Sequence, residues 1–317
     1  MKVGVTGASG FIGKLLCRAL VAQGCQVVVL SRREDLDIPG VVVCKGDLTA
    51  GPDNLATFVE GLDILYHCAG ELKSEALMYP LHVSGTRALL AAVCSSIQRT
   101  GRTLHWVQLS SVGAYGPGQQ AANQARRIDE SCNPQPVGEY EVTKTLADES
   151  LLAVAAIEPR LSYTLIRPSI VIAASMPNQS FFQFAHAVRR RLFFYIGEGN
   201  AVATYVHVDD VVRALLNCLG CEQAKNKTFI LSNDCTQREL VGAIAAYYGV
   251  KPPVLVLPEK PLRILVRLLP ARRSPLTQDR IDALVRRTQY CTDHAADVLG
   301  FSPRPLPEQL AAVLKTS

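Results

Sequence analysis

The feature that most constrains the fold is a glycine-rich segment, TGASGFIG at residues 6–13, between a short apolar run and a longer amphipathic one. The run Val3–Thr6 predicts a strand and Phe11–Gln23 predicts a helix. In this context, glycines permit a tight turn, a close ligand approach and close packing of helix on sheet. The segment therefore predicts a βα unit whose helix N-terminus can receive a phosphate group. The three glycines are Gly7, Gly10 and Gly13.

Short apolar runs alternate with longer helical patterns through the first half of the chain. The strand runs are apolar at nearly every position, which is typical of a sheet covered by helices on both faces. This alternation predicts an α/β fold with a Rossmann-type, doubly wound parallel sheet. The predicted strands are Val3–Thr6, Gln26–Leu30, Val41–Cys44, Asp63–His67, Thr103–Leu109 and Tyr163–Arg167, and the helices between them are Phe11–Gln23, Leu55–Glu60, Leu81–Gln98 and Glu139–Ile157.

The glycine segment supplies the backbone groups that a dinucleotide pyrophosphate needs. Free N–H donors and the helix dipole favour an anion at this point. Arg32 and Arg33 follow the second predicted strand, where arginine suits the 2′-phosphate of NADP and an acidic residue would favour NAD. We expect NADP as the preferred cofactor, while Glu34 and Asp35 leave NAD open. The residues expected at the pyrophosphate are Gly7, Ser9, Gly10, Phe11, Ile12 and Gly13.

Two further motifs carry candidate reactive side chains. Ser110–Gly116 (SSVGAYG) follows the fifth predicted strand, at the edge where a parallel sheet binds its ligand. Tyr140 and Lys144 lie four residues apart on a predicted helix and therefore on one face. A nearby ammonium is expected to lower the pKa of the phenol, which can then exchange a proton with an alcohol or a carbonyl. Ser111 would orient the substrate oxygen, with Val112 beside it.

The regular alternation ends after Pro168, and this change predicts two regions. We expect residues 1–172 to form the dinucleotide-binding domain. Residues 203–233 are expected to return to this domain and to its main sheet. Residues 173–202 and 234–317 would form a smaller, mostly helical substrate-binding region.

In this order, the motifs resemble those of the extended short-chain dehydrogenase/reductase superfamily, often called the NAD-dependent epimerase/dehydratase family. The resemblance covers essentially the whole chain and is specific for the superfamily, though not for a substrate. The matching segments are TGASGFIG at 6–13, GDL at 46–48, HCAG at 67–70, SSVGAYG at 110–116, YEVTK at 140–144, RPS at 167–169, YVHVDDV at 205–211 and LGFSP at 299–303.

The resemblance implies roles for further residues. Lys144 would hydrogen-bond the nicotinamide ribose, and the nicotinamide would exchange hydride with a substrate carbon while Tyr140 moves the proton. The other implied cofactor contacts are Asp47 and Leu48 at the adenine, Cys68, Ala69 and Gly70 along the middle, and Pro168 and Ser169 beside the nicotinamide.

One position departs from the pattern of these proteins. Their long helix normally carries N-V-x-G-T, whereas this chain has HVSGT at residues 82–86. The usual asparagine helps to order the water and lysine network of the site. Histidine can donate or accept there, but its charge can change near neutral pH. We expect an active enzyme whose pH profile depends on His82, unless that side chain only fills space.

Three functions are compatible with the motifs. The favoured one is an NAD(P)-dependent reductase or dehydrogenase acting on a carbonyl or alcohol, with a keto nucleotide-sugar as one candidate substrate. Residues 189–191 are three arginines that could grip a diphosphate, with Arg190 as the candidate contact, although aromatic residues at 181–195 form either core or an apolar pocket. The alternatives are a nucleotide-sugar epimerase or dehydratase that retains NAD, and a non-catalytic NADP-binding redox sensor.

Composition argues against several other partners. The net charge of +5 comes largely from scattered arginine clusters without a continuous basic stripe, so no nucleic-acid partner is expected. Most of the ten cysteines lie in apolar runs, and Cys218 with Cys221 forms a lone C-x-x-C, so no metal site is expected. Free thiols suit a reducing compartment, and we expect a cytoplasmic protein.

Apolar runs are too short for a membrane span, which needs about 18 residues. The segment Pro261–Pro270 contains two arginines and could lie on a membrane surface, although a helix packed on the core is favoured. The helices near 81–98 and 139–157 could join two copies as a homodimer, but a helix buried within one chain would show the same pattern.

Overall fold

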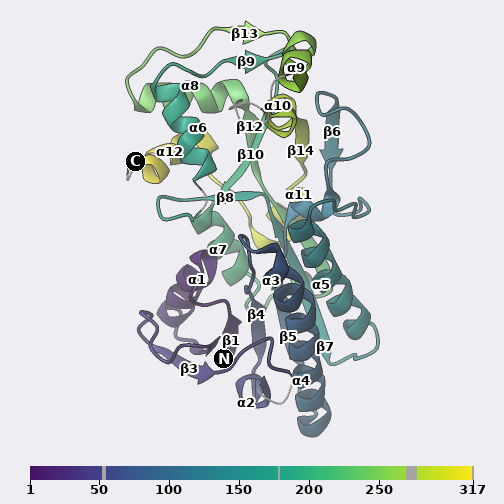
Figure 1. Ribbon diagram of the computed structural model, residues 1–317. Helices are drawn as coiled ribbons and strands as arrows, with labels where there is room; N and C mark the ends of the chain where they lie inside the picture. Colours follow the sequence, from purple (N-terminus) through teal and green to yellow (C-terminus); the bar gives the residue numbers. More distant parts are fainter. Residues whose placement is uncertain (52–54, 178, 269–276, 316–317) are drawn as a thin grey trace.

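A seven-stranded parallel sheet forms one half of the computed structural model, which describes residues 1–51, 55–177, 179–268 and 277–315 (Figure 1). The strand order is β11-β7-β5-β4-β1-β2-β3, so the chain changes direction between β1 and β4. Ligands of such sheets bind at the carboxyl ends of the strands beside this switch point. The strands are β1 (Lys2–Thr6), β2 (Gln26–Ser31), β3 (Val41–Lys45), β4 (Ile64–His67), β5 (Leu104–Leu109), β7 (Leu161–Pro168) and β11 (Lys227–Leu231).

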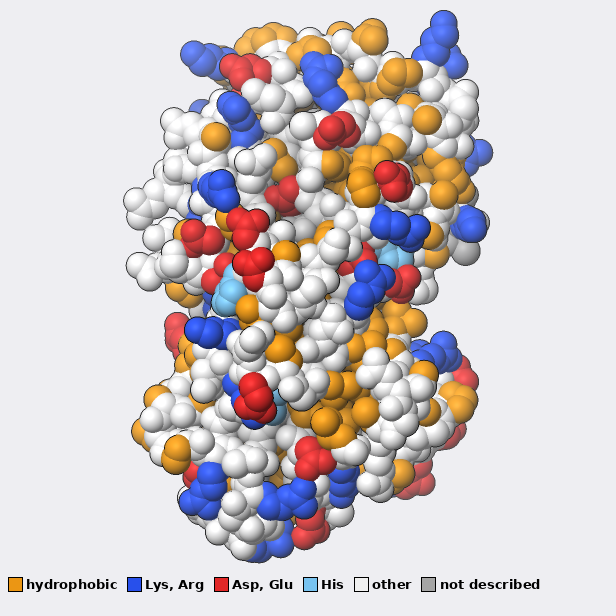
Figure 2. Space-filling model, turned by 180° about the vertical axis from the view of Figure 1, so that it is seen from behind, with side chains coloured by type: hydrophobic (Ala, Val, Ile, Leu, Met, Phe, Trp, Pro, Cys, Tyr) orange, Lys and Arg blue, Asp and Glu red, His pale blue; other side chains and the backbone are white. Residues whose placement is uncertain are grey.

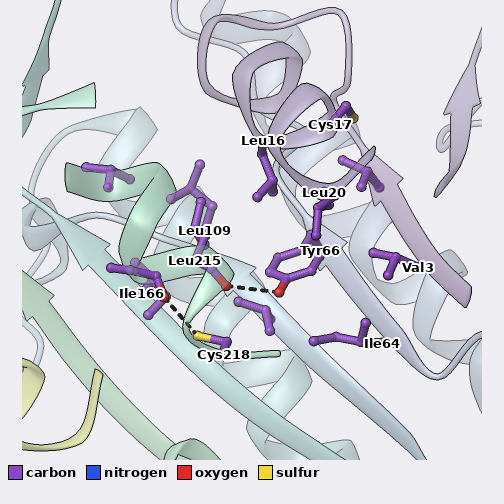
Figure 3. Close-up of a cluster of buried hydrophobic side chains, with 14 of the residues drawn as sticks. Val3, Leu16, Cys17, Leu20, Ile64, Tyr66, Leu109, Ile166, Leu215 and Cys218 are labelled. Carbon is purple, nitrogen blue, oxygen red and sulfur yellow. Dashed lines mark hydrogen bonds between the residues drawn. The ribbon is translucent and has the colours of Figure 1, made fainter. Parts of the chain in front are cut away.

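Helices cover both faces of this sheet, which confirms the doubly wound fold. One face carries α1 (Phe11–Ala22), α7 (Val208–Leu216) and α11 (Asp293–Leu299), with η4 (Glu222–Ala224) near its edge. Its core is fully buried, and the Tyr66 hydroxyl donates to the Leu215 carbonyl oxygen at 2.9 Å (Figure 3). The other face carries α2 (Ala56–Val59), α4 (Gly85–Thr100) and α5 (Glu139–Ala155) around Trp106.

The long helix expected at 81–98 is one continuous helical segment with a local change of pitch. It consists of α3 (Glu75–Tyr79), a π-helical turn η2 (Pro80–Ser84) and α4. Proline lacks the N–H that would continue an α-helical ladder, so Pro80 favours such an irregular turn. π-turns are frequent at functional sites, and this one carries His82.

The second half of the molecule consists of small sheets and helices (Figure 1). One three-stranded sheet has the order β12-β10-β8, and two-stranded sheets join β13 to β9 and β14 to β6. The strands are β6 (Ala125–Ile128), β8 (Ile170–Ile172), β9 (Tyr195–Ile196), β10 (Val202–His207), β12 (Asn233–Thr236), β13 (Val256–Leu257) and β14 (Arg287–Tyr290). The helices are α6 (Ser180–Arg189), α8 (Gln237–Tyr247), α9 (Glu259–Leu268), α10 (Gln278–Val285) and α12 (Leu306–Leu314).

The topology corrects two expectations about the second region. Residues 203–233 do not return to the main sheet as a whole: α7 and β11 do so, whereas β10 pairs with β8 and β12. The segment around β6, expected in the first domain, pairs instead with β14 near the C-terminus. Hydrophobic pattern does not identify the distant partners with which such short strands pair.

The segment expected as a helix at Pro261–Pro270 is α9, and its last two residues lie outside the described part of the chain. Leu262 and Val266 pack against Ile196, Ile281 and Val285, as favoured from the sequence. None of the described helices combines the length and apolarity that crossing a bilayer requires.

Candidate active site

The glycine loop lies between β1 and α1 and has the geometry of a phosphate cradle. Gly7 adopts φ +69°, and a Cβ there would lie 2.6 Å from the backbone nitrogen of Ala69. A Cβ on Gly13 would collide with the Gly7 carbonyl oxygen. Helix α1 begins after Gly10 without a side-chain cap and without an acidic residue in its first turn. Its first N–H groups can therefore bind an anion, and the loop fits a dinucleotide pyrophosphate.

The residues expected at the adenosine end lie after β2 and β3. Arg32 and Arg33 are exposed just beyond the end of β2, and the charge of Arg32 helps to lower the pKa of Asp47. The main cause of that lowering is Thr49, whose backbone N–H donates to the Asp47 carboxylate at 2.9 Å. Leu48 is buried against Gly85 at the start of α4. This edge thus combines an exposed guanidinium pair with an ordered carboxylate.

The segment Cys68–Gly70 continues β4 directly beside the glycine loop. The Cys68 backbone N–H donates to the Thr6 carbonyl oxygen at 3.2 Å, which holds this segment against the end of β1. A Cβ on Gly70 would lie 3.5 Å from His82 Nε2. The segment therefore joins the dinucleotide cradle to the π-turn that carries His82.

Ser111 lies after β5 and begins the 3₁₀ turn η3 (Val112–Tyr115). Its Oγ accepts the backbone N–H of Gly113 at 3.0 Å, which leaves the hydroxyl hydrogen available to a substrate oxygen. A Cβ on Gly113 would lie 2.5 Å from Glu141 Cγ, so η3 packs tightly on the first turn of α5. This packing brings Ser111 to the helix end that carries Tyr140.

Tyr140 and Lys144 project from the first two turns of α5. The Lys144 ammonium is buried and donates to the Leu109 carbonyl oxygen at 2.6 Å, at the end of β5. Burial lowers the pKa of Lys144, although the Asp148 carboxylate opposes this. Burial raises the pKa of Tyr140 to about 12, with smaller contributions from Glu141 and Asp148. The expectation that Lys144 lowers this pKa is therefore wrong, because desolvation of the phenolate dominates.

His82 is 2 % exposed and both ring nitrogens have partners. Nε2 accepts the Glu71 backbone N–H at 2.8 Å, so in the neutral ring Nδ1 carries the hydrogen and donates to Thr143 Oγ1 at 2.8 Å. The ring meets that of Tyr140 edge-on, with centroids 5.5 Å apart. Burial, with a smaller contribution from Lys144, lowers the pKa of His82 to about 4. The expected change of charge near neutral pH is therefore wrong: His82 acts as a neutral polar link.

We predict that His82→Asn weakens the acid sensitivity of the fold. In the folded protein the pKa of His82 is about 4, whereas the unfolded chain takes up the proton near the ordinary pKa of 6.5. The stabilisation is therefore fully present above pH 6.5 and is lost as the pH falls towards 4. Between pH 7 and 5, urea unfolding should show a loss that is about 2 kcal/mol smaller in His82→Asn than in the unmodified protein. Exposed His186, replaced by Asn, is the control, and equal losses in all three proteins would contradict the assignment.

A buried polar network behind Lys144 was not anticipated from the sequence. Asp148 lies one turn after Lys144 on α5; its carboxylate accepts Ser110 Oγ at 2.6 Å and Arg167 Nη2 at 3.2 Å. The side chains of Arg167 and Asp148 are 6 % and 1 % exposed, and the Arg167 guanidinium lies 5.0 Å from the centre of the Tyr115 ring. The i, i+4 spacing of Lys144 and Asp148 was the available signal. The network ties α5 to β5 and β7 just behind the reactive residues.

The other site residues predicted from the sequence lie in two separate parts of the structure, after β7 and at the end of α6. Pro168 ends β7, and Ser169 is buried, with a hydrogen bond of 2.9 Å between its Oγ and Ser232 Oγ. Arg190 is exposed at the end of α6, a helix that packs on α8 in the second region. The preceding Arg189 stacks 5.3 Å from the ring centre of Tyr248.

The aromatic residues of the second region form core, as expected for most of them. Phe181 and Phe182 are 2 % and 8 % exposed, and Phe181 meets Tyr205 edge-on at 5.3 Å between ring centroids. The rings of Phe184 and Phe193 are half-buried and also meet edge-on. These ring contacts hold α6 against β9 and β10.

Comparisons with known proteins agree with this architecture. The profile of the NAD dependent epimerase/dehydratase family matches residues 3–231. Among curated proteins, the chain is 27% identical to a 2-alkyl-3-oxoalkanoate reductase of Stenotrophomonas maltophilia, over 100% of this chain and 99% of that protein. It is 25% identical to a 4-hydroxy-2-methyl-3-oxo-4-farnesyl-3,4-dihydroquinoline-1-oxide ketoreductase of Stigmatella aurantiaca, over 98% and 94% of the two chains.

Among solved structures, MoeE5 in complex with UDP-glucuronic acid and NAD superposes with a TM-score of 0.74. The two sequences are 25% identical, and the match covers 100% of this chain and 98% of MoeE5. The chain belongs to the NAD dependent epimerase/dehydratase family and is an NAD(P)-dependent oxidoreductase of the extended short-chain dehydrogenase/reductase type.

Proposed function

We propose that this member of the NAD dependent epimerase/dehydratase family reduces a carbonyl to an alcohol, with Tyr140 as the proton donor. The observation that carries this proposal is the packing of η3 on the first turn of α5, which brings Ser111 to the helix end where Tyr140 and the buried Lys144 lie. Burial raises the pKa of Tyr140 to about 12. The phenol is therefore protonated at neutral pH, as a general acid must be. A bound reduced nicotinamide cofactor would supply the hydride for the carbonyl carbon, and Tyr140 would give its proton to the carbonyl oxygen, so that an alcohol forms.

The other residues of the site bind and orient. Ser111, whose Oγ is fixed by the Gly113 N–H, is proposed to donate its hydroxyl hydrogen to the substrate oxygen. Lys144, buried behind Tyr140, is proposed to hydrogen-bond the nicotinamide ribose and to stabilise the phenolate after proton transfer. The residues proposed to hold the cofactor are Gly7, Ser9, Gly10, Phe11, Ile12, Gly13, Arg32, Arg33, Asp47, Leu48, Cys68, Ala69, Gly70, Pro168 and Ser169.

We infer that the enzyme prefers NADP, because two exposed arginines follow β2. Arg32→Ala removes a guanidinium that can grip the 2′-phosphate through charged hydrogen bonds, each worth about 1.5–3 kcal/mol. The expected result is a KM for NADPH that rises about tenfold or more, with the KM for NADH nearly unchanged. Arg18→Ala, which removes another exposed arginine from α1, is the control. An equal change for both cofactors would contradict the preference.

The proposed substrate is a 3-oxo compound that carries a hydrocarbon substituent. The names of the two curated relatives that match nearly the whole chain contain a 3-oxo group beside an alkyl or farnesyl chain. A keto nucleotide-sugar is the second candidate, because MoeE5 was solved with UDP-glucuronic acid. Steady-state rates with 2-alkyl-3-oxoalkanoates and with UDP-sugars distinguish the two; turnover of the UDP-sugars alone would exclude the first class.

Epimerisation is the alternative activity for this site. An epimerase returns its hydride to the substrate, so it retains its cofactor and shows no net oxidation of NADPH. Cofactor that co-purifies and does not exchange would favour this alternative. The second alternative is a redox sensor that performs no chemistry. Its behaviour would be unchanged by the substitution Tyr140→Phe.

We further propose a homodimer that forms through α4 and α5. These helices pack on each other and border a groove of about 470 Å³ lined largely by apolar and small side chains, among them Leu90, Ala91 and Ala153. Ala153→Arg places a charge in this groove and should convert the dimer to monomer in multi-angle light scattering. A dimer that survives this substitution would contradict the proposed interface.

A further inference from the structure

The end of the second region farthest from the main sheet exposes a group of large apolar side chains. Val254 is 87 % exposed and Leu268 is 78 % exposed, whereas side chains of this kind are usually buried. We call this group the apolar end; its members are Leu192, Val254, Leu255, Ile264, Leu265 and Leu268. Exposed apolar side chains that gather at one end of a molecule are candidates for an interaction site.

The chain brings these residues together through β9, β13 and α9. β13 pairs in parallel with β9, with Val256 opposite Tyr195, so the residues just before each strand are also neighbours. The Tyr195 backbone N–H donates to the Leu255 carbonyl oxygen at 2.9 Å. Helix α9 begins directly after β13, and all three elements lie at the same end of the molecule (Figure 1).

Helix α9 has one broad apolar side, and only one edge of it packs within the chain. Leu262 and Val266 face the second region and pack on its core. Ile264, Leu265 and Leu268 point away from that core and are 60 %, 53 % and 78 % exposed. With 3.6 residues per turn, these side chains form one broad apolar side of α9, with Leu262 and Val266 at one edge and Ile264 at the other. Packing within the chain therefore accounts for one edge of this apolar side and leaves the rest without a partner among the described residues.

Exposed cations lie close in sequence to the residues of the apolar end. Arg190, Arg191, Lys251, Lys260 and Arg267 are all exposed. Within the described ranges, none of them has a carboxylate at ion-pair distance; the nearby Arg263, by contrast, pairs with Glu259 and Asp282. Figure 2 shows hydrophobic and basic side chains together at this end of the molecule. The surface thus combines exposed apolar groups with uncompensated positive charge.

We propose that the apolar end docks the protein on the surface of an anionic phospholipid bilayer. Apolar side chains of an amphipathic helix enter the boundary between headgroups and acyl chains, and flanking lysines and arginines bind anionic headgroups. A second copy of this chain fits less well, because a two-fold contact would bring two positively charged surfaces together. The inference rests on this surface alone and not on the substrate of the active site.

Vesicle co-sedimentation of the full chain tests this proposal. One set of vesicles is phosphatidylcholine alone, and in the other about 30 % of the lipid is anionic phosphatidylglycerol. We expect binding to the anionic vesicles that weakens as salt is raised. Two variants should each lower the partition coefficient about tenfold or more: Ile264→Ser with Leu265→Ser and Leu268→Ser, and Lys260→Glu with Arg267→Glu. Ile157→Ser, which removes an exposed apolar side chain beyond α5, should bind as the unmodified protein does.

All of the changed side chains are exposed, so NADPH binding and the melting temperature should be retained in every variant and report that each one folds. Three outcomes would overturn the proposal: no sedimentation at low salt, equal binding to both vesicle types, or equal loss in the Ile157→Ser control. A dimer that dissociates in the two variants, without vesicle binding, would identify this surface as a contact between copies instead.

Discussion

Replacing Tyr140 by Phe is expected to lower kcat for NADPH-dependent reduction by about 10²–10⁴-fold, the usual contribution of a positioned general acid. The phenol is half-buried beside neutral His82, and burial raises its pKa to about 12, so it holds its proton throughout the neutral range. Phe keeps the ring and its edge contact with His82 but has no proton to donate. The affinity for NADPH, measured by fluorescence titration, should change little.

The matched control is Tyr163→Phe, which removes a hydroxyl from a half-buried tyrosine of β7. Its kcat should stay within about threefold of the unmodified value, since its hydroxyl takes no part in the proposed chemistry. If Tyr140→Phe retains more than about a tenth of the activity, Tyr140 is not the proton donor.

Replacing Arg167 by Met is expected to lower the free energy of unfolding by about 3–5 kcal/mol, the usual cost of leaving one member of a buried ion pair without its partner. The Asp148 carboxylate would keep Ser110 Oγ but lose the guanidinium that compensates its charge. Burial already raises the pKa of Asp148 against the opposing effect of Arg167, so the carboxyl should take up a proton more readily in the variant. Urea unfolding at pH 7 measures the loss.

Two further variants separate this effect from a general loss of arginine. Arg160→Met removes an exposed guanidinium that pairs with Glu158, and it should cost less than about 1 kcal/mol because that guanidinium is in contact with water. Asp148→Asn combined with Arg167→Met should recover part of the stability, because it removes the carboxylate charge that Arg167→Met leaves without its guanidinium; the recovery is only partial, since the buried Lys144 ammonium also loses that carboxylate. Equal losses in Arg160→Met and Arg167→Met would contradict the role given to the buried pair.

The sequence predicts the cofactor half of the fold well because its signals are local. Strands with apolar residues on nearly every position, followed by helices, specify a covered parallel sheet, and the structure has these strands within one or two residues of the predicted ends. Gly7 and Gly13 also act as predicted, since a Cβ at either one meets backbone across the loop. These effects depend on residues that are close in sequence or in register.

The electrostatics of the site could not be predicted in the same way. Spacing places Tyr140 near Lys144, but whether charge or desolvation controls the pKa depends on how deeply tertiary packing buries both groups. Likewise, His82 is neutral because burial lowers its pKa to about 4, and its ring nitrogens bond the Glu71 backbone N–H and Thr143 Oγ1, which come from elsewhere in the chain. The ion pair of Asp148 with Arg167 joins a helix to a strand, and no local pattern pairs them.

The pairing of the short strands in the second region is equally non-local. β6 and β14 are more than 150 residues apart in the sequence, and neither has a pattern that identifies the other. Periodicity could not distinguish the exposed part of the apolar side of α9 from its packed edge, because both are apolar. The structure distinguishes the two parts, and the exposed part supports the proposed bilayer contact.

The most direct test of the central claim is the stoichiometry of NADPH oxidation during turnover. The purified enzyme would be mixed with NADPH and a 2-alkyl-3-oxoalkanoate, and the NADPH lost and the alcohol formed would be quantified together. Reduction with Tyr140 as proton donor predicts one alcohol for each NADPH oxidised, and almost no product with Tyr140→Phe over the same time. Conversion of a substrate without net NADPH oxidation, or undiminished alcohol formation by Tyr140→Phe, would contradict the account.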